Sequence, residues 1–213
     1  MSERVRIPAG GFDLEAEATL AQAGAPAVVV CHPHPAFGGR MDTPLVVRLA
    51  EAAEAAGWSA VRFNFRGLGQ SGGRPTGGLL EHEDVRTVAA WLRENGAARV
   101  VLWGYSFGAL MAMKAVAEGE PAAALAAVGF PTTIIGDNAD RLADVARAIG
   151  RGLPWLFLQG DQDGFCELER VRSWAGPPNV ELQILDGAGH FFSGAAADEV
   201  AQRVTRFTER ALR

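Results

Sequence analysis

Two hydrophobic patterns alternate along this chain. Runs of consecutive apolar residues, such as the three valines of PAVVVC, predict strands buried on both faces of a sheet. Between these runs, apolar residues recur every three or four positions, as on the buried face of an amphipathic helix. The predicted strands cover residues 26–31, 58–65, 99–104, 122–130, 154–160 and 180–185, and the predicted helices cover residues 43–56, 79–95, 106–118, 138–149, 166–174 and 195–212.

The first twenty residues follow a different pattern. Two strand-like segments, RVRIP and FDLEAEATL, are separated by Gly10 and Gly11. The second segment alternates apolar and polar side chains, as a half-exposed antiparallel strand does. Farther along, Asp42 is the expected N-cap of the helix over 43–56, and Gly57 is its expected end. We therefore expect an antiparallel strand pair ahead of the alternating elements.

Buried strands that alternate with helices predict a doubly wound α/β sheet, mostly parallel, with helices on both faces. Residues 1–213 contain no Pro/Gly/Ser-rich linker, repeat or low-complexity segment, so we expect one domain. In such sheets the ligand binds beyond the carboxyl ends of the strands. The turns that follow strands are therefore where functional residues are expected.

Composition excludes several classes of partner. The chain carries a formal charge of −5 and has no basic run, which argues against binding nucleic acid or anionic membranes. Its apolar runs are shorter than the ~20 residues that span a bilayer. The charged start lacks the apolar core of a secretory signal, and two cysteines are too few for a disulfide scaffold. We expect a cytoplasmic protein; its oligomeric state is left open.

Two glycine motifs follow predicted strands. The first, GLGQSG at 67–72, matches the dinucleotide fingerprint G-x-G-x-x-G. That fingerprint requires a helix to begin at once, so that its N-terminus can hold a pyrophosphate. Here further glycines and Pro75 continue the loop, which favours a flexible connection over a nucleotide site.

The second motif, GYSFG at 104–108, is G-x-S-x-G between a strand and the apolar helix ALMAMKAVAE. This context is typical of a nucleophile elbow, a tight turn that raises the serine above the sheet edge. Small flanking residues are needed because the turn brings backbone segments close together. The alternative interpretation is that Ser106 is an ordinary helix N-cap.

A serine nucleophile needs a base and a group that orients the base. His190 lies in a glycine-rich loop after the strand at 180–185, and Asp161 and Asp163 follow the strand at 154–160. The order serine, acid, histidine on successive strand ends is the order of the α/β hydrolases. We therefore predict Ser106, an aspartate and His190 as catalytic residues.

These pieces resemble the α/β-hydrolase superfamily along nearly the whole chain, and most closely its small, lidless, dienelactone-hydrolase-like serine hydrolases. The segments that carry the resemblance are HPHPAFGG, FNFRGLGQSGG, GYSFGA, GDQD and GAGHFF. The resemblance implies that the acid is the fourth residue of G-x-x-D, which is Asp163; Asp161 is the second choice and Asp186 the third. The elbow carries serine where dienelactone hydrolases carry cysteine, which favours ester or thioester cleavage.

The resemblance also implies a role for the HPHP segment, because the loop after the third strand supplies one backbone N–H of the oxyanion hole. Pro33 and Pro35 have no N–H, so His34 is the expected donor beside Phe107, with Phe37 and Gly38 as fallbacks. The rival interpretation is a metal site. Two histidines two positions apart in extended backbone point to opposite faces, and no Cys/His cluster completes a coordination shell. We predict no metal and no cofactor.

The expected function is a serine hydrolase that cleaves a small acyl ester or thioester. The stretch between the strands at 122–130 and 154–160, where many relatives insert a lid, holds one short predicted helix. We therefore expect an open, shallow pocket. Two alternatives remain: a protein that binds a ligand or partner without catalysis, and a serine peptidase or amidase.

Overall fold

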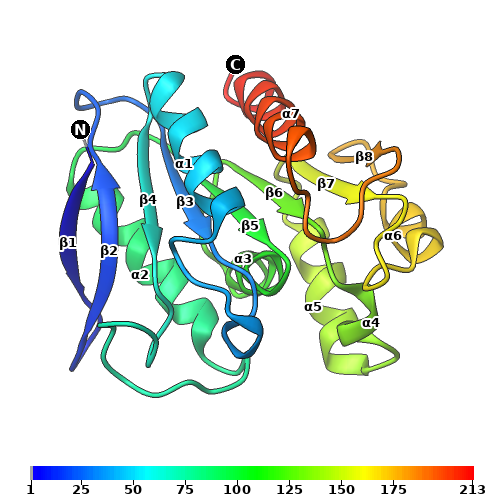
Figure 1. Cartoon of the computed structure of the whole chain (residues 1–213), viewed down its shortest axis with the longest axis horizontal. Coiled ribbons are helices and arrows are strands. Elements are labelled where there is room, and N and C mark those ends of the chain that lie inside the picture. The colour runs from blue at the N-terminus through cyan, green and yellow to red at the C-terminus, as the bar shows by residue number, and fades with distance from the viewer. Residues whose placement is uncertain (1) are drawn as a thin grey trace.

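One eight-stranded sheet forms the centre of the computed structural model, which describes residues 2–213 (Figure 1). The strand order is β1-β2-β4-β3-β5-β6-β7-β8. The first two strands pair antiparallel, β2 pairs antiparallel with β4, and all pairs from β4 to β8 are parallel. The strands are β1 (Glu3–Pro8), β2 (Asp13–Thr19), β3 (Ala27–Cys31), β4 (Ser59–Phe63), β5 (Val100–Tyr105), β6 (Ala124–Val128), β7 (Trp155–Gly160) and β8 (Val180–Leu185).

Helices cover both faces of the sheet. Contacts place α1 and α7 together on one face, in front of the sheet in Figure 1, and α2, α3 and α5 on the other. Each face has its own apolar core, as a sheet buried on both sides requires. The helices are α1 (Pro44–Ala55), α2 (Glu81–Glu94), α3 (Phe107–Ala117), α4 (Thr132–Ile135), α5 (Ala139–Gly150), α6 (Leu168–Trp174) and α7 (Ala195–Ala211), with a 3-10 turn, η1, at Pro35–Phe37.

The predicted elements are confirmed, with small shifts at their ends and one wrong cap. The structure has Thr43, not Asp42, at the N-cap of α1. Pro44 occupies the first helical position, and the residue before a proline is pushed into extended backbone, which is the N-cap conformation. Thr43 accordingly has ψ 130°. Gly57, with φ 78°, follows the helix as expected.

The region between β6 and β7 contains only α4 and α5, so no lid domain is inserted there. The single-turn α4 lies outside the predicted elements. None of the helices within residues 2–213 is both long and apolar enough to cross a membrane.

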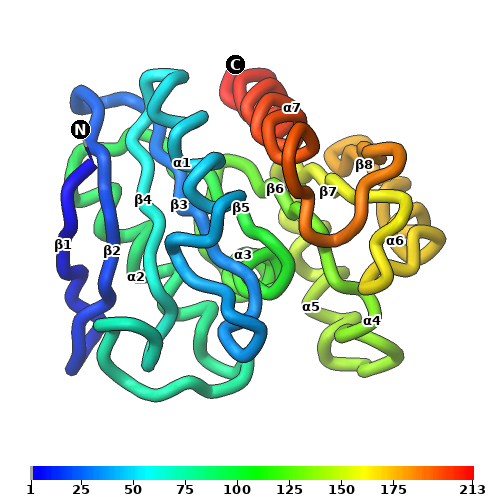
Figure 2. Tube along the Cα trace, in the orientation of Figure 1, coloured from blue at the N-terminus to red at the C-terminus, as the bar shows by residue number. Residues whose placement is uncertain are grey.

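The glycine-rich segment 67–72 is a loop, as predicted, and α2 begins only at Glu81. The buried Glu15 carboxylate of β2 accepts hydrogen bonds from the Gln70 N–H and the Asn64 side-chain amide, both 2.8 Å long. These contacts attach the loop to the sheet. In Figure 2 the loops after β3 and β4 and the α4 segment all lie along the lower edge of the sheet.

Candidate active site

A strained turn places Ser106 between β5 and α3. Its backbone has φ 54° and ψ −116°, a conformation that few residues other than glycine adopt. A Cβ at Gly104 would lie 2.4 Å from the Ala109 Cα, and a Cβ at Gly108 would lie 2.3 Å from the Cys31 carbonyl oxygen. Both flanking positions therefore have room only for glycine, which explains the residue types of the motif.

The Ser106 hydroxyl does not cap α3. Its Oγ lies 2.9 Å from Nε2 of His190. The serine is therefore positioned for proton exchange with an imidazole rather than as an ordinary helix cap.

Asp163 lies on the other side of that imidazole. Its Oδ2 is 2.8 Å from Nδ1 of His190, and its Oδ1 accepts a 2.8 Å hydrogen bond from the Phe165 N–H. A carboxylate next to Nδ1 keeps the proton on that nitrogen and leaves Nε2 free to accept one from Ser106. The Tyr105 hydroxyl also donates to the His190 carbonyl at 2.9 Å, which holds the histidine loop against the end of β5.

The other two acids considered from the sequence lie away from the imidazole. Asp161 accepts a 2.7 Å hydrogen bond from the Gly187 N–H and is exposed. Asp186 is also exposed. The structure thus brings together Ser106, Asp163 and His190, from the ends of β5, β7 and β8.

Neither cysteine is suited to compete with Ser106 as a nucleophile. Burial raises the pKa of the Cys31 thiol, and burial with the nearby Asp163 charge raises the pKa of Cys166 to about 12. Both thiols are therefore protonated at neutral pH, and a thiol is a much weaker nucleophile than a thiolate.

His34 faces the cleft in the loop after β3. Its Nδ1 accepts a 3.1 Å hydrogen bond from the Ala36 N–H, and its ring packs 4.8 Å from the Phe107 ring. Within residues 2–213 no hydrogen bond involves the N–H of His34 or of Phe107. The fallback donors are already engaged: Phe37 N–H bonds to the His34 carbonyl and Gly38 N–H to the Pro35 carbonyl, each at 3.0 Å.

His32 points the opposite way, into the protein. Its Nδ1 lies 2.7 Å from the Pro33 carbonyl oxygen, and its Nε2 accepts from the Phe65 N–H at 3.2 Å. Burial lowers the pKa of His32 to about 4, so the ring is neutral and both nitrogens are occupied. Because a trans peptide holds C=O and N–H on opposite sides, the Pro33 carbonyl facing His32 turns the His34 N–H away from it. The HPHP pattern alone did not reveal that the buried His32 ring orients the peptide between Pro33 and His34.

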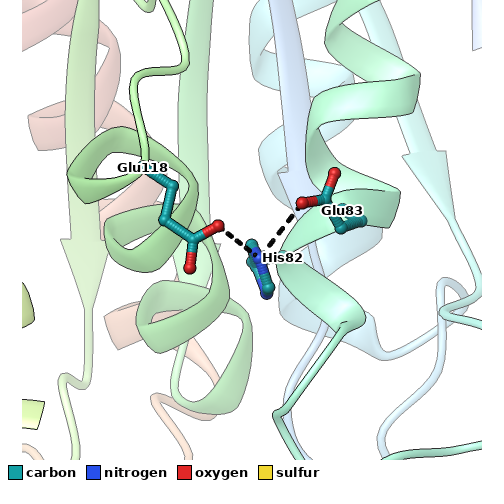
Figure 3. A group of neighbouring side chains, drawn as sticks. All are labelled: His82, Glu83 and Glu118. Carbon is teal, nitrogen blue, oxygen red and sulfur yellow. Dashed lines mark hydrogen bonds and ion pairs between the residues drawn. The ribbon is translucent and has the colours of Figure 1, made fainter. Parts of the chain in front are cut away.

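A group that could hold a metal ion does occur elsewhere, at His82, Glu83 and Glu118 (Figure 3). Nε2 of His82 lies 2.8 Å from Glu118 and 3.3 Å from Glu83, which joins α2 to the end of α3. Glu118 follows the last residue of α3, whereas Ser106 precedes the first, so the two sites lie about 18 Å apart along the helix. This group does not touch the serine cleft.

The cleft beside Ser106 consists of two connected cavities, of about 370 and 600 Å³. The smaller includes Ser106 and His190, and both include His34, Phe37, Ile134 and Phe165. Residues of α4, α5 and the loop at 77–79 form part of the walls of the larger cavity.

Comparison with known proteins agrees with this geometry. Residues 26–210 match the family described as an alpha/beta hydrolase domain. An α/β serine hydrolase homologue from Coxiella burnetii is 32% identical, covers 96% of both chains and superposes with a TM-score of 0.82. A lidless α/β serine hydrolase from Xanthomonas campestris is 27% identical, with a TM-score of 0.81 over 98% of this chain and 94% of that one.

The third comparison is with a protein sequence rather than with a solved structure. An uncharacterized protein of Rickettsia prowazekii is 29% identical over 177 residues, which cover 79% of this chain and 72% of that protein. The fold, the serine turn and the family match all lead to the same assignment. The chain belongs to the α/β-hydrolase family and is similar in structure to its lidless serine hydrolases.

Proposed function

We propose that this protein is a serine hydrolase that cleaves a carboxylic ester or thioester through an acyl-enzyme on Ser106. The observation that carries the proposal is the hydrogen-bonded chain from Asp163 through His190 to Ser106, with links of 2.8 and 2.9 Å. Nucleophile, base and orienting carboxylate at these distances match the arrangement of serine hydrolases.

In the first step, Oγ of Ser106 attacks the substrate carbonyl carbon and its proton passes to Nε2 of His190. Asp163 stabilises the imidazolium that forms. When the tetrahedral intermediate collapses, the bond to the leaving oxygen or sulfur breaks, and the leaving atom takes the proton from His190. Water then attacks the acyl-enzyme with His190 as the base, which releases the acid and restores the serine.

The negative charge on the carbonyl oxygen needs hydrogen-bond donors. The N–H groups of Phe107 and His34 are the proposed pair, because neither is engaged within residues 2–213 and both residues line the cleft. Phe107 also begins α3, so the positive end of the helix dipole adds to the stabilisation. Loss of one such donor typically costs about 3 kcal/mol of transition-state stabilisation.

Labelling with a fluorophosphonate tests the nucleophile directly. We expect one phosphonyl adduct, located by peptide mass spectrometry on Ser106, together with hydrolysis of short acyl esters or thioesters. Ser106→Ala should lose the adduct and essentially all hydrolysis while keeping its melting temperature, because no other group can form the acyl-enzyme. Retention of a tenth of the activity would overturn the serine mechanism. An unlabelled, inactive wild type would favour a protein that binds without catalysis.

The two aspartates of the GDQD turn provide a matched pair of variants. Asp163→Asn should lower kcat by about 10⁴-fold, because an amide cannot hold the required tautomer. Asp161→Asn should lower kcat only a few-fold. The Asp161 carboxylate accepts a hydrogen bond from the Gly187 N–H, and the amide oxygen of asparagine can accept the same bond. The comparison uses kcat at saturating ester. A reversed result would reassign the acid without removing the serine.

A further inference from the structure

The two cavities differ in their relation to the reacting groups. We call the one that contains Ser106 and His190 the histidine cavity and the other, lined by Phe107, Leu110 and Met111, the α3 cavity. Neither Ser106 nor His190 lines the α3 cavity. It instead includes His34 and Phe107, the two residues proposed to bind the oxyanion.

The α3 cavity follows one side of a helix. Phe107, Leu110, Met111 and Lys114 stand at positions i, i+3, i+4 and i+7, which share one face. At a rise of about 1.5 Å per residue this face is about 10 Å long. Ile134 and Ile135 of α4 form part of the opposite wall. The cavity is therefore an elongated apolar trough that starts beside the proposed oxyanion donors.

The chemistry of acyl transfer distinguishes the two cavities. The leaving oxygen or sulfur must lie within hydrogen-bond reach of Nε2 of His190, because that nitrogen returns the proton. The leaving group is therefore directed into the histidine cavity. The rest of the acyl group extends from the carbonyl carbon on the side away from His190, where the α3 cavity begins.

We propose that the α3 cavity is the acyl-binding site and that the enzyme prefers straight-chain acyl esters or thioesters of about eight carbons. Because tetrahedral angles make a chain zigzag, C–C bonds of about 1.5 Å each advance it by about 1.25 Å, so roughly eight carbons cover about 9 Å of the trough. The inference rests on the function proposed above and adds the class of substrate to it.

The far end of the trough sets the limit on chain length. The Lys114 ammonium donates to the Leu79 carbonyl at 2.8 Å, which attaches the loop at 77–79 to α3. Charged side chains of α5, Arg141 and Asp144, also line the cavity, and Arg141 donates to the Ile134 carbonyl on its α4 wall. Methylenes beyond this point would meet charged groups and water instead of apolar side chains, so they add no binding energy.

The rim supports an apolar occupant. Four residues that line the α3 cavity are large apolar side chains with unusual exposure: Phe37 at 82%, Leu79 at 69%, Phe165 at 41% and Ile134 at 37%. Such residues are costly to leave in water. A hydrocarbon chain in the trough would cover part of their surface.

Chain-length series test the assignment. With one constant leaving group, kcat/KM should rise about three- to fourfold for each methylene from acetyl to octanoyl, the gain for a buried methylene, and level off beyond that. Lengthening the alcohol at a constant acyl group should give no such progression. A flat acyl series, or the same progression on the alcohol side, would overturn the assignment.

A variant that fills the α3 cavity gives a second test of the acyl-site assignment. Met111→Trp should lower the octanoyl-to-acetyl ratio of kcat/KM at least tenfold, because the larger ring occupies the space that the chain needs. Met111→Leu, a swap of similar volume, should keep the ratio within about twofold. Circular dichroism and melting curves of both variants exclude misfolding. An unchanged ratio in Met111→Trp would contradict the inference.

The two proposals fail in different ways. If the wild type hydrolyses no ester and no fluorophosphonate labels Ser106, the proposed function fails. Calorimetry with sodium octanoate then tests the cavity by itself: binding that Met111→Trp weakens and Met111→Leu keeps supports an apolar-chain site, and no binding to the wild type overturns it.

Discussion

The turn after β5 and the loop after β3 carry the two backbone N–H groups that we propose bind the oxyanion, yet the two segments are held in place by different means. In the turn at 104–108 the local backbone requires Gly104, because a Cβ there would lie 2.4 Å from the Ala109 Cα, and the adjacent end of β3 requires Gly108. The loop after β3 depends on contacts made at a distance, above all the buried His32 ring between the Pro33 carbonyl and the Phe65 N–H. The glycines of the turn stand together in one short motif, whereas His32 and Phe65 are far apart in the sequence and form none.

The two segments also touch. The missing Cβ of Gly108 would meet the Cys31 and His32 carbonyl oxygens at 2.3 and 2.7 Å, so the serine turn packs directly against the start of the β3 loop. A change in one segment can therefore displace the other. The three predictions below separate their contributions.

Gly108→Ala should have the largest effect. The added methyl would collide with backbone atoms of β3, which cannot rotate away, so Ser106 and the Phe107 N–H should both shift. Misplacement of a nucleophile by 1 Å can cost about 10²-fold, and a lost oxyanion contact about 10²–10³-fold, so kcat/KM should fall more than about 10³-fold. Overpacking should also cost about 1–3 kcal/mol of stability. Activity assays and thermal melts measure both.

Gly38→Ala is the matched control for this change. A Cβ at Gly38 meets no atom within 4 Å, although φ is 82°, so only backbone strain of about 1 kcal/mol is added. Its activity should stay within a few-fold of wild type. Equal losses of activity in the two variants would mean that the contact between the turn at 104–108 and the β3 loop does not affect catalysis.

His34→Pro should come next, with a loss of about 10²–10³-fold in kcat, because proline removes the N–H proposed to bind the oxyanion. His34→Ala keeps that N–H and should cost tenfold or less, about 1.4 kcal/mol. Wild-type circular dichroism of the proline variant is a required control. A severe loss in His34→Ala, together with activity that EDTA removes and a divalent ion restores, would instead favour a metal bound by the imidazole.

His32 should produce a smaller, pH-dependent effect on stability. Its pKa is about 4 in the folded protein and about 6.5 when exposed, so the unfolded state binds more protons between these values. The free energy of unfolding should therefore decrease as pH falls through this window, by about 2 kcal/mol between pH 7.5 and pH 5. Urea denaturation at the two pH values measures this decrease.

His32→Gln lacks the titrating ring and should lose that part of the slope. The nearby charges of Arg40 and Asp42, and the carboxylates elsewhere, are common to both proteins and cancel in the comparison. Parallel pH slopes in wild type and variant would show that the His32 ring is solvated and does not hold the β3 loop.

Much of this molecule was predictable because its information is local. Continuous apolar runs predicted β3 and β5 to β7, and the glycines around Ser106 predicted the elbow. Parallel strands end at one edge, so the residues after β5, β7 and β8 were expected to converge, and Ser106, Asp163 and His190 do lie within hydrogen-bond distance. Their catalytic roles stay predictions.

The rest had two causes: a proline at one helix start, and contacts between residues far apart in the sequence. Asp42 has a good N-cap side chain, but Pro44 moved the helix start to Thr43. The partners of His32 lie on another strand end, and the α3 cavity arises only when α4, α5 and the loop at 77–79 meet. The hydrophobic periodicity carries no information about contacts between distant segments. Neither the partners of His32 nor the α3 cavity could therefore be derived from it.

The strand order also determines at what stage of synthesis the three side chains of the candidate site can come together. Ser106 and Asp163 lie on loops that leave the ribosome well before residue 190, and His190 follows β8, the last strand of the chain and an edge of the sheet. Edge elements have fewer neighbours and open more readily than central ones. A nascent chain that has completed the sheet through β7 already holds the serine turn but lacks His190, the proposed base. The proposed hydrolysis would therefore require β8 and the loop that follows it to have docked against the rest of the sheet.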